Sequence, residues 1–268
     1  MLTFFYGGTG TGKSYAMMDK IKQAAENGRK VCVIVPDQFT FEYEHMLYNH
    51  LGCALFNKGN TEVWSFSRLA ADIFRCTKAP EGMGADSTVK TAVMHKVIRL
   101  ISEREGLLFF DKQAKRASFA NTALTMLSEL IHSGVTPEVL GEILKTAPDN
   151  MRDKLTDLFL IYSEYSSELA ALGMRDILLD ARLAADMAEQ NGYFNDMCLF
   201  MDEFKSFTGD QYNMIRVMLS QCAELTVCMT SDDIGKGGFG PFTAVNETCA
   251  GLSSRYLRRV RLRMRRHM

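Results

Sequence analysis

Eight residues near the start of the chain have the types and spacing of a phosphate-binding loop. They read Gly7-Gly8-Thr9-Gly10-Thr11-Gly12-Lys13-Ser14 and fit the pattern G-x-x-x-x-G-K-[ST]. Glycines let backbone N–H groups turn toward phosphate oxygens, and the positive end of a following helix dipole adds to that attraction. In such a loop Lys13 reaches the β- and γ-phosphates and Ser14 holds Mg²⁺. Because a predicted strand precedes the loop and a predicted helix follows it, binding of ATP with Mg²⁺ is favoured over a glycine-rich turn without a ligand.

Two carboxylates follow an apolar stretch late in the chain. Asp202 and Glu203 come directly after residues 197–201, which read as a buried strand. A phosphate-binding loop of this kind needs a carboxylate near its metal ion, and Asp202 fits that place. Ser14 and Asp202 are therefore the predicted Mg²⁺ ligands. Asp202 and Glu203 are the predicted catalytic pair, with Glu203 polarising an attacking water. The alternative is a solvated acidic strand end.

Aromatic and hydrogen-bonding side chains occur together after three predicted strands. The segments are Pro36-Asp37-Gln38-Phe39-Thr40-Phe41, Trp64-Ser65-Phe66-Ser67-Arg68 and Phe204-Lys205-Ser206-Phe207-Thr208. Open α/β sheets bind ligands beyond the carboxyl ends of their strands. Rings that stack on bases, beside donors that meet phosphates, suit single-stranded nucleic acid. The alternative is that these rings belong to the core.

The hydrophobic pattern changes twice along the chain. Short apolar runs predict strands at 2–6, 31–35, 62–66, 197–201 and 225–229, and periodic segments predict helices at 13–27, 41–51, 68–74 and 211–219. A linker is expected at 79–84, and the 3.6-residue period continues from 87 to about 190. Asp176 and Asp180 are expected at a solvated helix end, four residues apart on one face.

These patterns predict an α/β fold, a parallel P-loop (RecA-like) sheet with an inserted all-helical domain. The expected domains are residues 1–80 and 193–246 for the two parts of the P-loop domain, 85–192 for the helical insertion, and 247–268 for a basic tail.

Composition bounds the function classes. The chain has 268 residues, a net charge of −1, and no apolar run near the roughly 20 residues of a membrane-spanning helix. Seven cysteines without Cys-x-x-Cys spacing, and no leader-like N-terminus, indicate reduced thiols in a cytoplasmic protein. Residues 255–268 hold seven arginines and no acidic residue, so the remainder carries 24 basic and 32 acidic side chains. The tail is expected to be either a nucleic-acid arm or a truncated or non-native end, and the second is favoured.

Three stretches resemble one known family, the AddB (RexB-like) subunit of the bacterial AddAB helicase–nuclease. They are residues 35–41 with Glu44, residues 65–70, and residues 202–204 with Phe207, Thr208 and Gln211. The order of P-loop, proline-ended second strand, helical block and late acidic strand is similar to the first motor domain of UvrD-like helicases. The resemblance runs from Leu2 to about Asn246.

This resemblance implies a part in double-strand break repair by recombination. The B subunit of that family keeps a P-loop, is regarded as a degenerate helicase, lines the path of one DNA strand and takes part in recognising the Chi sequence. An AddA-like helicase–nuclease subunit would be the partner in a heterodimer. The implied DNA-facing residues are Gln38, Thr40, Phe66 and Arg68, with Phe204 or Phe207. Arg68 would contact a phosphate or base and the phenylalanines would stack.

The sequence departs from the family pattern in three respects. Ala71 stands where the family often has an aromatic residue after Arg-Leu-Ala, and Glu203 stands where it usually has glycine after the aspartate. The second motor domain, the nuclease domain and the iron–sulfur cysteines do not occur in these 268 residues, so this chain is not expected to cut DNA itself. Glu203 restores the acidic pair of active helicases, which leaves ATP hydrolysis open.

Two other functions remain open at this point. One is a self-sufficient small P-loop ATPase or kinase that uses Lys13, Ser14, Asp202 and Glu203 as a complete site. The other is a non-enzymatic interaction module, whose helical block binds a protein and whose nucleotide is structural. Turnover of ATP would favour the first, and binding of single-stranded DNA would argue against the second.

Overall fold

The computed structural model describes residues 2–56, 60–104 and 106–231, together with Glu247, Ala250 and the pair Arg265–Arg266. Apart from those few positions, the predicted basic tail and the last part of the P-loop domain, 232–246, lie outside the described residues. The described chain forms two compact units. One contains the residues up to Lys78 and those from Ala184 onward, and the other is Ala79–Leu183.

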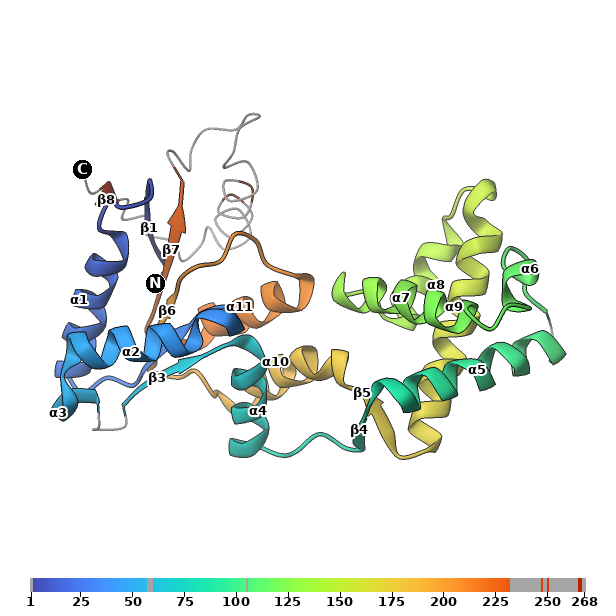
Figure 1. The fold of residues 1–268 in the computed structure, drawn as a ribbon, viewed down its shortest axis with the longest axis horizontal. Helices are drawn as coiled ribbons and strands as arrows, with labels where there is room; N and C mark the ends of the chain where they lie inside the picture. The colour runs from blue at the N-terminus through green and yellow to red at the C-terminus, as the bar shows by residue number, and fades with distance from the viewer. Residues whose placement is uncertain are drawn as a thin grey trace. The chain divides into compact units, whose positions relative to one another are not determined.

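The first unit is an α/β fold on a parallel sheet, which confirms the predicted class. Its strands are β1 (Leu2–Gly7), β2 (Val31–Ile34), β3 (Thr61–Trp64), β6 (Cys198–Met201), β7 (Glu224–Thr230) and the two-residue β8 (Arg265–Arg266). Its helices are α1 (Lys13–Glu26), the 3₁₀ turn η1 (Asp37–Phe39), α2 (Thr40–Leu51), α3 (Cys53–Phe56), α4 (Phe66–Cys76), α10 (Asp180–Asn191) and α11 (Gly209–Gln221). The first residues of α10 precede Ala184, so the boundary between the two units falls within this helix. The strand order is β3-β2-β6-β7-β1-β8, and every pair is parallel. Figure 1 labels all of these strands except β2.

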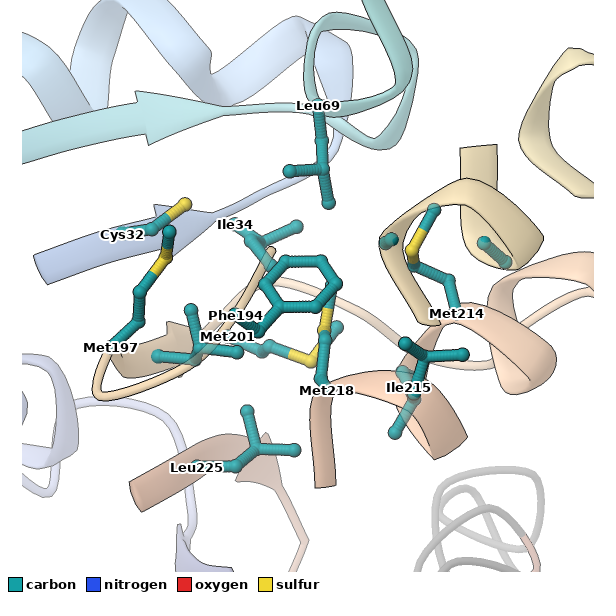
Figure 2. Close-up of a cluster of buried hydrophobic side chains, with 14 of the residues drawn as sticks. Cys32, Ile34, Leu69, Phe194, Met197, Met201, Met214, Ile215, Met218 and Leu225 are labelled. Carbon is teal, nitrogen blue, oxygen red and sulfur yellow. The ribbon is translucent and has the colours of Figure 1, made fainter. Parts of the chain in front are cut away.

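Both faces of the sheet are covered, as the continuous apolar runs require. Successive side chains of a strand point to opposite faces. Along β2, Val31 and Val33 therefore join a core with residues of α1 and α2, while Cys32 and Ile34 join the opposite core. The second core, drawn in Figure 2, is supplied mainly by α4, α10, α11 and the neighbouring strands. Each fully buried apolar side chain stabilises the unit by about 1.5–3 kcal/mol.

The position of β6 in the sheet brings distant parts of the chain together. β6 lies between β2 and β7, so Met201 sits beside Ile34 although 167 residues separate them in sequence. Since all these strands run in the same direction, the residues that follow β1, β2, β3 and β6 emerge at one edge. The predicted phosphate loop, the aromatic segments and the acidic pair all follow these strands.

The second unit is mostly helical. Its elements are β4 (Met83–Ala85), α5 (Ser87–Arg104), α6 (Asp111–Ala114), α7 (Phe119–His132), α8 (Pro137–Lys145), α9 (Asp149–Ala171), β5 (Met174–Asp176) and η2 (Ile177–Leu179). Apolar side chains of α5, α7, α8 and α9 form its core. No helix in the described part of the chain is both long and apolar enough to cross a bilayer.

Two expectations for the helical unit are wrong. The predicted linker, 79–84, ends inside β4, which pairs with β5 from 91 residues later, and no local period reveals so short and distant a pairing. Asp176 lies in β5 and is buried, not solvated. Its carboxylate accepts hydrogen bonds from the Lys90 ammonium at 2.8 Å and the Tyr165 hydroxyl at 3.0 Å. Those partners offset the cost of burying the charge.

A buried carboxylate, Asp157 of α9, organises the turn before α6. It is completely buried and accepts hydrogen bonds from the backbone N–H groups of Leu108, Phe109 and Phe110, at 2.8–2.9 Å. We expect Asp157→Ala to lower the free energy of unfolding of this unit by about 2–3 kcal/mol, because three backbone donors, of which that of Phe110 is buried, lose a charged acceptor. The exposed Asp153→Ala on the same helix is the control, expected within about 0.5 kcal/mol of wild type.

Two optical signals report the two units during urea unfolding. Far-UV circular dichroism reports the helices of both units, whereas fluorescence of Trp64, the single tryptophan, reports the α/β unit, so an unfolding step seen by dichroism and not by fluorescence belongs to the helical unit. A lower dichroism midpoint for Asp157→Ala is expected. Equal midpoints for the two variants would contradict the role assigned to Asp157.

Candidate functional site

The loop between β1 and α1 has the backbone of an anion site. Gly10 and Gly12 have φ of 78° and 79°, a left-handed conformation that favours glycine. α1 then begins at Lys13 with no side-chain cap and no acidic residue in its first turn. The N–H groups at this end are therefore available to an external acceptor. The Lys13 ammonium lies over the same loop and donates to the Gly8 carbonyl oxygen at 2.7 Å.

The carboxylate of Asp202 connects this loop to the late strand β6. Asp202 is 5% exposed, and its Oδ2 accepts a hydrogen bond from the Ser14 hydroxyl at 3.2 Å. The same oxygen accepts from the buried Tyr43 hydroxyl of α2. Its Oδ1 accepts from the backbone N–H of Glu203 at 2.8 Å. Hydroxyl and carboxylate oxygens are ligands that Mg²⁺ takes beside substrate phosphates, so this pair and the uncapped helix fit a nucleotide with Mg²⁺.

The charge of Asp202 alters the titration of its neighbours. Burial, followed by that charge, raises the pKa of the Tyr43 phenol, so Tyr43 remains a hydrogen-bond donor. The same two causes raise the pKa of the Cys228 thiol, which stays protonated. Burial also raises the pKa of the Glu203 carboxyl, and the carboxylates of Asp202 and Glu42 raise it further. Glu203 is nevertheless an exposed residue, so the raised pKa fits an acid–base role without excluding the solvated strand end.

Glu203 also has an unusual backbone. Its φ is 65°, in the left-handed region, where a side chain with a Cβ is disfavoured by about 1–2 kcal/mol. Glycine adopts this conformation without that cost. The resemblance leads one to expect a glycine after the aspartate. The left-handed backbone at this position explains why glycine would be preferred there. In this chain the site keeps a carboxylate in spite of the strain.

A pocket of about 580 Å³ opens beside Glu203 at the same edge of the sheet. Its lining comes from segments after β2, β3 and β6, namely Val35, Pro36, Asp37, Gln38, Phe39, Phe66, Glu203, Phe204, Lys205, Ser206 and Gln211. All three aromatic-and-polar segments singled out from the sequence thus contribute to one concave surface. The lining mixes rings, amides, one ammonium group and the carboxylates of Asp37 and Glu203, and its rings and amides suit a ligand with flat bases.

Two phenylalanines of the lining, Phe66 and Phe204, pack against a third, Phe207, that lies outside it. Phe66 and Phe204 lie edge to face with ring centroids 5.6 Å apart, and both are half-buried. Phe207 lies 5.0 Å from Phe204 and 6.4 Å from Phe66, and it belongs to the core. Phe207 therefore supports the other two rings from below, while Phe66 and Phe204 keep exposed ring surface.

Polar contacts hold the two early segments together. The Ser67 hydroxyl donates to Asp37 Oδ1 at 2.7 Å, and hydrogen bonding by the Ser65 and Ser67 hydroxyls lowers the pKa of the Asp37 carboxyl. Arg68 is 57% exposed and pairs with Glu44 at 3.2 Å. Exposed pairs of this kind contribute only about 0–1 kcal/mol, so the Arg68 guanidinium remains available to another anion.

The structure separates the six predicted DNA-facing residues into two groups. Gln38, Phe66, Arg68 and Phe204 have exposed or half-buried side chains. Thr40 and Phe207 are buried, because the Thr40 hydroxyl donates to the Asp37 carbonyl oxygen and Phe207 packs in the core. Because these two side chains are buried, they do not fit the direct DNA contacts expected of them. Their positions fit a role in supporting the surface from inside.

Tyr43 of α2 belongs to this region but was not predicted, and Phe41 was predicted only as a member of the segment 36–41. Tyr43 faces the core and reaches Asp202, a contact 159 residues away that no local pattern indicates. Phe41 is 80% exposed. The sequence held a signal for it, because the buried stripe of α2 is Thr40, Tyr43, Leu47 and Leu51, and Phe41 falls outside that helical period.

Comparison with known proteins gives a consistent result. Residues 4–256 match the family described as ADDB, N-terminal. Relatives named as the B subunit of an ATP-dependent helicase/deoxyribonuclease include those of Clostridium tetani, 26% identical over 88% of this chain, Clostridioides difficile, 28% over 89%, and Clostridium acetobutylicum, 29% over 86%. The match covers 20–21% of each relative, so the chain spans about a fifth of their length.

The raised pKa of Glu203 makes a prediction about stability and pH. A carboxyl whose folded pKa is above its unfolded value contributes stability at low pH that is lost as pH rises through the folded pKa. We therefore expect Glu203→Gln to gain stability relative to wild type between pH 4 and pH 7.5. Thermal unfolding at both pH values measures this difference.

Glu189→Gln is the matched control because the pKa of Glu189 is shifted in the opposite direction to that of Glu203. The Arg216 guanidinium, which binds both oxygens of Glu189 at 2.6 and 2.7 Å, lowers the pKa of that carboxyl. Its stabilising effect is present at pH 7.5 and lost as pH falls through the folded pKa. Glu189→Gln should therefore lose stability relative to wild type as pH rises. The same trend in both variants would contradict the assignment for Glu203.

Proposed function

Since the chain belongs to the ADDB N-terminal family, we propose that it is the ATP-binding, single-stranded-DNA-contacting part of the B subunit of an ATP-dependent helicase–deoxyribonuclease. The observation that carries the proposal is the contact between Ser14 and Asp202. It joins the start of α1 to the end of β6, beside a glycine-rich loop and a helix N-terminus without a side-chain cap. A P-loop nucleotide site needs this combination of hydroxyl, carboxylate and backbone donors.

Each residue of the site has a separate task in this proposal. Backbone N–H groups of the loop and the Lys13 ammonium hold the phosphates. Ser14 and Asp202 hold Mg²⁺, which when bound neutralises charge on the β- and γ-phosphate oxygens. Tyr43 orients the Asp202 carboxylate by its hydrogen bond to Oδ2. Glu203 orients and deprotonates water if the bound nucleotide is hydrolysed.

The pocket at the sheet edge is the proposed path of a DNA strand. Phe66 and Phe204 offer ring faces for stacking, which contributes about 1–3 kcal/mol per base. Gln38 and Lys205 of the lining offer donors for phosphates and bases, and Arg68, near the start of α4 and outside the lining, offers another. Glu203 lines the pocket and directly follows Asp202, so a single residue adjoins both proposed sites.

The larger assembly follows from the family and is likewise proposed. The relatives are named as the B subunit of an ATP-dependent helicase/deoxyribonuclease. We therefore place this chain with an AddA-like helicase–nuclease partner in the cytoplasm, in recombinational repair of double-strand breaks with Chi recognition. Nuclease activity is assigned to other parts of that assembly.

Nucleotide binding tests the first part of the proposal. Removing the Lys13 ammonium deletes a charge-assisted phosphate contact, so we expect Lys13→Ala to weaken MgATP binding about 10–100-fold. Lys22→Ala, further along α1, is the matched control and should bind as wild type does. Equilibrium binding of a fluorescent ATP analogue measures both. Equal affinities for the two variants would contradict a P-loop site.

The nucleotide recovered from the protein then separates two functions. After incubation with labelled ATP, Mg²⁺ and single-stranded DNA, intact ATP on wild type indicates binding without turnover, as in a degenerate motor. ADP that disappears in Glu203→Gln indicates a catalytic Glu203 and favours a self-sufficient ATPase. Because the pKa of Glu203 is raised, this ATPase activity should fall on acidification at a higher pH than it would with an ordinary glutamate.

Arg68 tests the DNA path. We expect Arg68→Ala to weaken binding of labelled oligo(dT) roughly ten-fold at 0.1 M salt and to reduce the salt slope by about 0.7, because one phosphate contact is lost. Arg75→Ala is the control, an exposed arginine of the same helix α4 that pairs with Asp72. Fluorescence anisotropy across a salt series measures both variants. An unchanged slope for Arg68→Ala would rule out this contact.

A further inference from the structure

A second concave surface lies in the helical unit, away from any residue assigned above. It has a volume of about 760 Å³ and is formed by α5, by α6 and by the three residues after α6 (both helices are labelled in Figure 1). Its lining is Ala92, His95, Lys96, Ile98, Arg99, Ser102, Asp111, Ala114, Lys115, Arg116 and Ala117. We call it the α5–α6 groove. Four lysines and arginines and one histidine face a single carboxylate there.

Charge is segregated within the unit that carries the groove. Residues 87–116 contain seven lysines and arginines against three acidic residues. The remaining residues of Ala79–Leu183 contain five against twelve. One segment is thus positive by four charges in a unit that is otherwise negative by seven. A long polyanion is attracted to this segment and repelled by the rest, which fixes where on the unit it binds.

Three of the four lysines and arginines of the groove are available to a new partner, and the fourth, Lys96, pairs with the half-buried Glu168 of α9. Lys115 pairs with Asp111 at 2.9 Å and Arg99 with Glu103 at 4.0 Å, and all four side chains are more than half exposed. Such pairs contribute about 0–1 kcal/mol, so a phosphate displaces the carboxylate at little cost. Within the described part of the chain, Arg116 has no ion-pair partner.

The shape of the groove fits a chain of phosphates. His95, Arg99 and Ser102 lie at i, i+4 and i+7 on α5, so they line one face over about 10 Å. That length covers about three phosphates of one strand, at 3.4 Å per phosphate along the duplex axis. Ala92, Ala114 and Ala117 are small, which lets a backbone approach closely between the longer basic side chains.

We propose that the α5–α6 groove is a nucleic-acid binding site, with Arg99, Lys115 and Arg116 as its principal phosphate contacts. The inference rests on the proposed function in one respect, the choice of nucleic acid among polyanions. Its position in the helical unit makes it a contact additional to the pocket at the edge of the sheet. Recognition through phosphates alone makes this contact independent of base sequence.

Variants of the whole chain in which three positive charges are removed test the groove. The triple change Arg99→Gln, Lys115→Gln and Arg116→Gln removes three exposed charges, and the control Lys145→Gln, Arg152→Gln and Lys154→Gln removes three from α8 and α9. Labelled oligo(dT) and a duplex of equal length are titrated from 0.05 to 0.3 M salt. We expect the groove variant to lose at least about ten-fold in affinity for one or both at 0.1 M, with a salt slope smaller by about two, and the control to keep both within two-fold.

A second measurement locates the contact directly. Acetylation of surface lysines, read by mass spectrometry, should be reduced at Lys96 and Lys115 when the oligonucleotide is present and unchanged at Lys145. Equal binding by the two triple variants, or equal acetylation with and without nucleic acid, would overturn the proposal. Binding of wild type to an acidic polypeptide such as polyglutamate, without binding to DNA, would also overturn it.

The two proposals fail in distinguishable ways. The groove variant keeps Lys13, Ser14, Asp202 and Arg68, so it should bind fluorescent ATP as wild type does. Loss of DNA affinity in Arg68→Ala but not in the groove variant would leave the proposed function standing and remove the groove. The reverse result would keep the groove and remove the DNA path at the sheet edge.

Discussion

The carboxylate of Asp202 is the group through which the candidate site is assembled. It is buried, and it accepts hydrogen bonds from Ser14 at the start of α1, from Tyr43 of α2 and from the backbone that follows β6. A buried charge is stable only when such donors surround it. Because the donors come from three separate segments, the carboxylate constrains how the phosphate loop, α2 and the end of β6 lie relative to one another.

Sheet topology is the reason that these segments meet. The strand order places β6 between β2 and β7, and all strands run in parallel. Residues that follow β1, β2, β3 and β6 therefore share one edge, and nucleotide chemistry and an aromatic pocket occur side by side there. Glu203 lines the pocket and follows Asp202, so the two functions proposed for this edge have a common residue.

Much of the α/β unit was predictable because its signals are local. Apolar runs of four to six residues marked the strands, and glycine and serine spacing marked the loop before Lys13. Asp202 could be assigned to the nucleotide site, since a phosphate loop needs a carboxylate near its metal ion and few other carboxylates directly follow a buried strand. ATP, Mg²⁺ and DNA binding remain predictions.

What the sequence did not reveal depends on contacts between distant residues. Tyr43 was not anticipated because its partner is 159 residues away. β4 was taken for a linker, since three residues paired with three others 91 positions later leave no periodic pattern. Asp176 was expected in solvent, and it is buried because Lys90 and Tyr165 reach it from other elements. The burial of Thr40 and Phe207 likewise depends on neighbours that the local pattern does not specify.

The left-handed backbone at residue 203 has a consequence for how this lineage can change. Glutamate and glycine codons differ by one nucleotide, and at this position glycine relieves backbone strain as it deletes the carboxylate. Selection against that mutation can therefore come only from the chemistry of the side chain, because the fold does not resist it. Loss of a working acidic pair is a short evolutionary step, and regaining it requires a residue that the backbone disfavours.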